Sequence, residues 1–180
     1  MASGDSHSIC LDDNGKLWCF GSNENGELGV RNNEDQQIPI QLSHSVPIIQ
    51  VAAGMNFSIF IDMNNTAWSF GNNNTGQLGL SDTEPRNSPT QILKLPPIQS
   101  ISCGNCHTVC IATNSTLWGF GNNYYGELGI NSNQQQNEPI QIPLSNITQV
   151  SCGGYHTLFL TSNKEVLACG ENSFGPLGLG

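Results

Sequence analysis

Short apolar and β-branched runs alternate with polar turns along the whole chain. Residues 7–11 and 16–21 are two such runs, and the segment between them, Asp-Asp-Asn-Gly at 12–15, ends in a strong hairpin signal. Residues 39–42 and 48–51 form two further short runs. No window shows the 3.6-residue periodicity of an amphipathic helix. The pattern therefore predicts β-structure, with four short strands in each stretch of 50 residues.

A nine-residue motif, Gly-x-Asn-x-x-Gly-x-Leu-Gly, occurs at residues 21–29, 71–79, 121–129 and 170–178. A glycine followed three residues later by an aromatic side chain precedes every copy, in the pairs Gly4/His7, Gly54/Phe57, Gly104/His107 and Gly153/His156. These markers are spaced by 50, 50 and 49 residues, which is the signature of a repeat architecture. The chain thus divides into units 2–51, 52–101 and 102–150 and a partial unit 151–180.

Four strands in each unit predict one blade of a β-propeller. The glycines of the motif permit positive φ in a tight loop, and the asparagine side chain can bond to the loop's amides. The histidine begins an inner strand, where we expect it to bond to the backbone of the neighbouring blade. We expect the motif leucines to lie between blades, at Leu28, Leu78, Leu128 and Leu177. The tryptophans of another column should lie in the blade core, at Trp18, Trp68 and Trp118.

The unit resembles the repeat of the regulator of chromosome condensation family, which has a Gly-x-x-His-(Ser/Thr) strand, a Leu-Trp-x-Phe-Gly strand and then the glycine motif. The resemblance covers essentially the whole chain. Departures are Phe57 in the histidine column, Ala67 where the first unit has Leu17, and Val-Leu-Ala-Cys-Gly at 166–170. The family's fold is a seven-bladed propeller, so the resemblance implies an all-β arc of about 3.5 four-stranded antiparallel blades, an incomplete ring.

An arc has two open ends, each with apolar blade surface and unpaired strand edges. Three arrangements would cover them. The 180 residues belong to a longer product, two copies close on each other by self-association, or an unrelated partner caps the arc. The sequence leaves all three open.

Composition and charge exclude several classes of partner. The net charge is −9, and the five basic residues are scattered, so no cationic stripe exists to neutralise phosphates or anionic lipid. We therefore expect no direct nucleic-acid binding and no membrane attachment. Seven cysteines, an odd number without a secretory signal, favour free thiols and a cytoplasmic or nuclear location.

The segment Cys103-Gly-Asn-Cys106-His107 matches the pattern for covalent haem attachment. Each of its members, however, is accounted for by its own repeat column, since Cys103 aligns with Cys152 and His107 with His7 and His156. Strand alternation also separates Cys106 from His107. No phosphate-binding loop and no Gly-x-Ser-x-Gly nucleophile elbow occurs. We predict no cofactor, no metal, no catalytic residue and no enzymatic activity in this chain.

Function on a repeat scaffold usually lies where the repeats differ. The tip inside the glycine motif differs most, and it carries Tyr124, Tyr125 and Phe174 where the other tips are polar. The long loop that follows each motif also varies and supplies charged candidates for partner binding: Arg31, Glu34, Asp35 and Arg86. The sequence therefore predicts a non-catalytic protein–protein interaction scaffold.

The resemblance implies two alternatives. One is guanine-nucleotide exchange on a small Ran-like GTPase, for which the family uses a β-hairpin wedge inserted in one blade; the regular 50, 50, 49 spacing leaves no room for such an insertion. The other is a set of regulatory repeats of a larger enzyme, such as a ubiquitin ligase.

Overall fold

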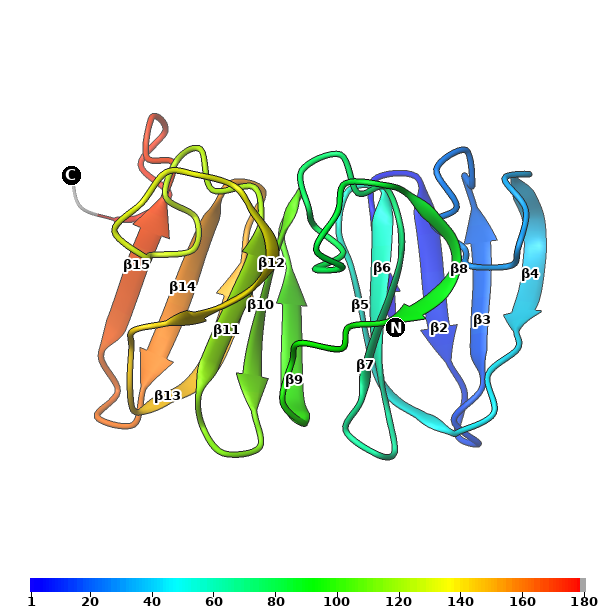
Figure 1. The fold of residues 1–180 in the computed structure, drawn as a ribbon, viewed down its shortest axis with the longest axis horizontal. Helices are drawn as coiled ribbons and strands as arrows, with labels where there is room; N and C mark the ends of the chain where they lie inside the picture. The colour runs from blue at the N-terminus through cyan, green and yellow to red at the C-terminus, as the bar shows by residue number, and fades with distance from the viewer. Residues whose placement is uncertain (179–180) are drawn as a thin grey trace.

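The computed structural model describes residues 1–178, in which every regular element is a β-strand. Four antiparallel sheets stand side by side, and each is built from one continuous stretch of the chain (Figure 1). The sheets are propeller blades in an arc that does not close on itself. The predicted all-β fold with an incomplete ring is confirmed, with three four-stranded blades and one of three strands.

The blades, numbered 1 to 4 along the chain, follow a simple order in which each strand pairs with the next. Blade 1 holds β1 (Ala2–Ser3), β2 (His7–Leu11), β3 (Leu17–Gly21) and β4 (Gln36–Leu42). Blade 2 holds β5 (Ile48–Ala53), β6 (Phe57–Asp62), β7 (Ala67–Gly71) and β8 (Arg86–Gln91). Blade 3 holds β9 (Ile98–Cys103), β10 (His107–Ala112), β11 (Leu117–Gly121) and β12 (Gln136–Ile142). Blade 4 holds β13 (Ile147–Cys152), β14 (His156–Thr161) and β15 (Val166–Gly170).

The blades begin at a different point of the repeat from the one expected. Residues 48–51 belong to β5 and pair with β6, with Val51 opposite Phe60, so their assignment as the last strand of the first unit was wrong. The unit boundaries after residues 51, 101 and 150 fall inside β5, β9 and β13. A tandem pattern fixes the length of the repeat but not where a blade starts, because any cut yields the same period.

The hairpin between the second and third strand of every blade contains one residue with positive φ. Gly15 has this conformation in blade 1 (φ 75°), and the same column holds Asn65, Ser115 and Lys164, at 61°, 65° and 69°. In each turn this residue donates its amide hydrogen to the carbonyl oxygen three residues earlier, at 3.0, 2.9, 2.9 and 3.0 Å. The predicted hairpin turns are therefore confirmed, and glycine is used at only one of the four.

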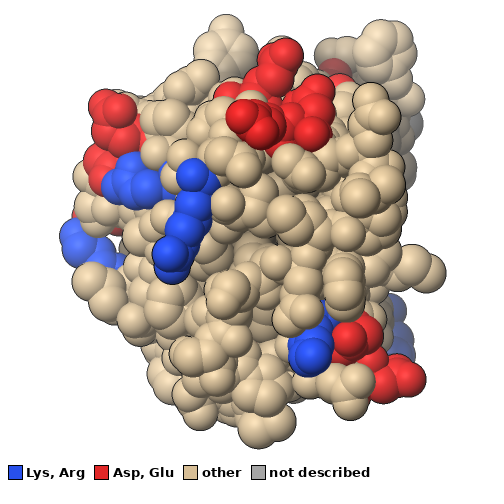
Figure 2. All heavy atoms as spheres, turned by 90° about the vertical axis from the view of Figure 1, so that its right-hand side faces the viewer, with Lys and Arg blue, Asp and Glu red and all other residues tan. Residues whose placement is uncertain are grey.

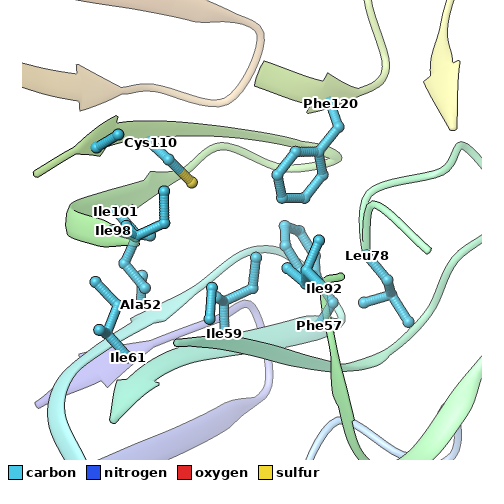
Figure 3. Packing of buried hydrophobic residues seen from close by; sticks show 12 residues of the cluster. Ala52, Phe57, Ile59, Ile61, Leu78, Ile92, Ile98, Ile101, Cys110 and Phe120 are labelled. Atoms are coloured by element: carbon cyan, nitrogen blue, oxygen red, sulfur yellow. The ribbon is translucent and has the colours of Figure 1, made fainter. Parts of the chain in front are cut away.

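Three apolar clusters join neighbouring blades, and a motif leucine is fully buried in each. Leu28 packs with Phe60 between blades 1 and 2, and Leu128 with Phe159 between blades 3 and 4. Between blades 2 and 3, Phe120 points toward Phe57 and Ile92, with Leu78 beside them (Figure 3). The predicted position of Leu28, Leu78 and Leu128 is confirmed. Leu177 is only half-buried, because the sequence contains no fifth blade to cover it.

Burial along the central strands shows which blade faces are covered. All six residues of β6 and of β10 are buried, as expected for strands with a blade on both sides. In β14 buried residues alternate with half-buried ones, and β2 begins with the same alternation. The two end blades are therefore covered on one face each.

Candidate functional site

The loops after β3, β7, β11 and β15 emerge at one rim of the arc, at the top of Figure 1. The motif asparagine holds each tip to the long loop that follows it. In blade 3 the Asn123 side chain accepts a hydrogen bond from the Leu128 amide (2.9 Å) and donates to the carbonyl of Ser132 (2.6 Å). Asn23 and Asn73 make the corresponding bonds in blades 1 and 2. The rim is thus a set of loops tied to a rigid frame.

The charged candidates in the long loops take part in local structure. Asp35 accepts a hydrogen bond from a backbone amide of its own glycine motif (2.8 Å), and Arg86 pairs with Asp82 (2.7 Å). The exposed Arg31 donates its backbone amide to a carbonyl of blade 2 (2.7 Å), while the Glu34 side chain is exposed. All four lie on blades 1 and 2, away from the aromatic tips.

Three tyrosines meet where blade 3 faces blade 4, and we call Tyr124, Tyr125 and Tyr155 the tyrosine cluster. The rings of Tyr124 and Tyr125 are 5.1 Å apart, and those of Tyr125 and Tyr155 are 5.8 Å apart, both edge to face. Tyr124 is 70% exposed, Tyr125 47% and Tyr155 44%. Large rings in this arrangement are common interface anchors.

Tyr155 was not among the predicted residues. It occupies the column of Ser6, Asn56 and Cys106 and lies directly before β14. It is the aromatic member of this column, which was the signal that the sequence offered. The tip of one blade reaches this column of the next: Thr75 Oγ1 lies 3.5 Å from the Cys106 carbonyl, and Tyr125 lies on Tyr155.

Phe174 belongs to the same tip column as Asn25, Thr75 and Tyr125. Its side chain is 98% exposed, since the blade that this column would contact is not part of the sequence. The ring that Tyr125 touches is therefore Tyr155 rather than Phe174.

Glu127 lies in the glycine motif of blade 3, directly after the two tip tyrosines. Its side chain is fully buried, and its Oε2 accepts a hydrogen bond from the Tyr125 amide (2.9 Å). Within residues 1–178, Oε1 has no hydrogen-bond partner. Burial raises the pKa of this carboxyl group, because removal from water disfavours the charged form.

Two of the repeat histidines form hydrogen bonds between blades. His7 Nε2 lies 2.9 Å from Ser58 Oγ of blade 2, and His107 Nε2 lies 3.0 Å from Thr157 Oγ1 of blade 4. Each hydroxyl donates its own hydrogen to a carbonyl oxygen of the blade that carries the histidine: Ser58 to Glu27 of blade 1, and Thr157 to Glu127 of blade 3, both at 2.8 Å. The imidazole must therefore be the donor, in its Nε2–H tautomer.

The expected histidine bond to a neighbouring backbone is thus corrected: it goes to a hydroxyl side chain, which in turn reaches the backbone. Burial lowers the pKa of His7 and lowers that of His107 to about 4, so both rings are neutral at physiological pH. A neutral, donating and enclosed ring suits packing rather than general base catalysis.

The members of the segment Cys103-Gly-Asn-Cys106-His107 lie in different surroundings and do not form one site. Cys103 ends β9, Cys106 precedes β10, and His107 faces blade 4 through Thr157. Burial raises the pKa of the Cys103 and Cys110 thiols, which keeps them protonated. In the part of the chain that the structure describes, no three His, Cys, Asp or Glu side chains are grouped so as to hold a metal ion.

Basic side chains are few, five against fourteen acidic ones. Figure 2 shows the blade 1 side of the arc, on which acidic groups lie toward the upper rim and most basic groups lie next to acidic ones. Arg86 pairs with Asp82 and Lys94 with Glu138. Among residues 1–178 there is no helix of the length and apolar character needed to cross a bilayer.

Comparison with known proteins places this architecture in a family. The model of the RCC1-like domain matches residues 1–180, the whole chain. The chain belongs to the RCC1-like domain family. A relative of this RCC1-like chain is the ultraviolet-B receptor UVR8 of Arabidopsis thaliana, which is 39% identical over 56 residues, 30% of this chain and 13% of UVR8.

Solved structures share the fold of this RCC1-like chain. Yeast RCC1 (Prp20), in its complex with Kap60, matches 99% of the chain at 20% identity and a TM-score of 0.88. Human WBSCR16 matches 94% at 24% identity and a TM-score of 0.82. Prp20p from Saccharomyces cerevisiae matches 96% at 22% identity and a TM-score of 0.78. The RCC1-like chain spans 46%, 44% and 43% of the WBSCR16, Kap60-complex and Prp20p chains, a little under half of each.

Proposed function

We propose that this chain is a non-catalytic protein-interaction module that binds a protein partner at the tip rim of blades 3 and 4. The observation that carries the proposal is the exposure of Tyr124 and Tyr125 on loops that a rigid frame holds in place. Aromatic side chains offer a large contact area for little loss of rotamer freedom. The nearby acids Glu127 and Glu171 favour a partner with basic residues at its interface.

The Tyr124→Ala/Tyr125→Ala double variant tests this function. It should keep the wild-type thermal melt but lose at least about 1–2 kcal/mol of binding free energy, as expected for an aromatic anchor. Affinity capture from cell extract, with bound proteins quantified for wild type and variant, gives the readout. Asn74→Ala is the matched control, because Asn74 occupies the column of Tyr124 one blade earlier and its side chain is exposed. A double variant that retains every partner would contradict the proposal.

Guanine-nucleotide exchange on a small Ran-like GTPase is the second candidate. It is supported by the fold of Prp20p, whose structure is described together with its binding properties to Gsp1p and histones. Release of a fluorescent guanine nucleotide from a purified Ran-like GTPase tests it, with acceleration as the positive result. Every strand among residues 1–178 is part of a blade, so these residues contain no inserted hairpin that could act as the wedge of an exchange factor.

We propose a cytoplasmic or nuclear location as well, because seven unpaired cysteines are typical of a reducing compartment. Self-association that closes the arc remains a hypothesis. The solution mass from light scattering tests it, since a mass of twice 19.4 kDa supports a dimer and a mass of 19.4 kDa contradicts it.

A further inference from the structure

The tyrosine cluster lies beside a buried carboxylate that its own chain leaves incompletely bonded. The two preceding blades provide internal comparisons, since Glu27 and Gln77 occupy the column of Glu127. Gln77 Oε1 accepts hydrogen bonds from the Thr75 amide (2.9 Å) and hydroxyl (2.8 Å). Its Nε2 donates to Asn72 Oδ1 (3.1 Å). Both polar atoms of the blade 2 side chain are therefore satisfied.

Blade 1 reaches the same result with a carboxylate. Glu27 Oε2 accepts a hydrogen bond from the Asn25 amide (2.7 Å), and Oε1 lies within 3.4 Å of Asn25 Nδ2 and 3.5 Å of Ser22 Oγ. In blade 3 the tip column holds Tyr125 instead of Asn25 or Thr75. The Tyr125 amide still donates to Glu127 Oε2, but its side chain packs on Tyr155 and gives Glu127 no second donor, so Oε1 is left without a partner. Blade 3 has replaced a local donor by an exposed aromatic ring.

A buried carboxylate oxygen without a partner is costly, and a cation or strong donor relieves that cost. The chain supplies none at this position. Arg86 and Lys94 are paired with Asp82 and Glu138. Lys164 lies between β14 and β15, and Lys16 lies between β2 and β3, both at the opposite rim of the arc (Figure 1). Arg31 lies on blade 1. Among the described residues no basic side chain lies at this position, so another molecule is the available source of a compensating charge.

Aromatic faces attract cations, and arginine does so more often than lysine. A guanidinium can stack on a tyrosine ring while it donates to a carboxylate oxygen, which suits a site with three rings and one unpaired acceptor. Glu127 is fully buried, so the guanidinium reaches it only if neighbouring side chains shift. Exposed side chains change rotamer within nanoseconds, and Tyr124 is the most exposed of the three rings.

We propose that the tyrosine cluster and Glu127 form a receptor for one arginine side chain presented by a protein partner. The proposal rests on the interaction function proposed above and names the chemistry that the partner must bring. The rings of Tyr124, Tyr125 and Tyr155 hold the flat guanidinium, and Glu127 Oε1 accepts one of its hydrogens. Because blade 4 is present to complete this site, the site does not depend on blades outside the sequence.

A titration of the full chain with three short probes tests the receptor. Acetyl-Gly-Arg-Gly-amide, its lysine analogue and its citrulline analogue are added separately, and amide chemical shifts are followed by NMR. Citrulline keeps the planar shape of arginine and removes the charge. The arginine probe should shift the amides of Tyr125 and Tyr155 saturably and bind about fivefold or more tightly than the citrulline probe, the size of a cation–π contact with a charged hydrogen bond.

Two matched variants locate the effect. Glu127→Gln should weaken the arginine probe about fivefold or more, whereas Glu27→Gln, the same change at the equivalent position of blade 1, should leave its affinity unchanged. Glutamine is native in this column at position 77, so both variants should fold, and their thermal melts verify this.

Equal affinity of wild type and Glu127→Gln, or equal affinity for the arginine and citrulline probes, would overturn the receptor. So would tighter binding of lysine than of arginine, or shifts that map to blade 1. Absence of arginine binding together with loss of partner capture in the Tyr124→Ala/Tyr125→Ala variant would refute the receptor while leaving the interaction function standing.

Discussion

Exchange of His107 for phenylalanine isolates the contribution of one inter-blade histidine to acid sensitivity. Phe57 occupies the same column in blade 2, so the fold already accommodates this ring beside the equivalent glycine. Burial lowers the pKa of His107 from 6.5 to about 4. At about 1.4 kcal/mol for each unit of pKa, the difference corresponds to about 3 kcal/mol of stability.

The sign follows from which state takes up the proton. Above pH 6.5 the imidazole is neutral in both states, and its contribution to stability is complete. As the pH falls below 6.5 the unfolded chain binds a proton that the folded chain refuses until about pH 4, so stability declines across this interval. Phenylalanine binds no proton, so His107→Phe lacks this component and loses only the hydrogen bond to Thr157, about 1 kcal/mol at every pH.

Urea unfolding followed by tryptophan fluorescence measures both proteins at pH 7.5 and pH 4.5. Carboxylates titrate in both proteins and cancel in the comparison, which leaves the histidine component alone. We expect wild type to lose about 2–3 kcal/mol more than His107→Phe between these two values. Parallel stability curves for the two proteins would refute the assignment of His107 as a neutral, buried donor.

Three further predictions concern packing and thiols. Leu78→Ala should destabilise the fold by about 2–5 kcal/mol in a thermal or urea melt, while Leu177→Ala, at a half-buried copy of the same column, should cost clearly less. Gly104→Ala should lower the melting temperature sharply, because the added methyl group would overlap the His107 ring and a carbonyl of blade 4; an unchanged melt would contradict this packing. Elemental analysis should find no stoichiometric zinc or iron, and thiol titration should find these residues reduced: Cys103, Cys106 and Cys110.

The features that the sequence predicted well are those whose residues recur in every repeat. The hairpin turns, the buried asparagines and the inter-blade leucines each depend on residues within one unit, so four copies of the pattern reinforce one another. The start of each blade was not predictable in this way. Residues 48–51 are a short apolar run with no marker that says whether they pair backward with β4 or forward with β6.

The candidate site was predicted in part for a related reason. Tyr124 and Tyr125 stand out because they differ from the polar tips of their own column. Tyr155 lies 30 positions beyond Tyr125, in a different column of a different blade, and their contact exists only because a tip crosses to the next blade. The unpaired Glu127 oxygen could not be predicted from the sequence either, because Glu27 and Gln77 in the same column both have hydrogen-bond partners.

The repeat also shows why blade 3 is the place to look for binding. At the tip column, Asn25 and Thr75 each satisfy the side chain two residues later, which is the locally consistent choice. Tyr125 breaks that consistency twice, because it exposes an aromatic ring and leaves a buried carboxylate oxygen without a donor. Neither change stabilises the isolated blade, whereas both suit a cationic side chain brought from outside. Departures from a local rule that lack compensation inside a protein are expected at functional sites, and within the described part of this chain the tip of blade 3 is such a departure.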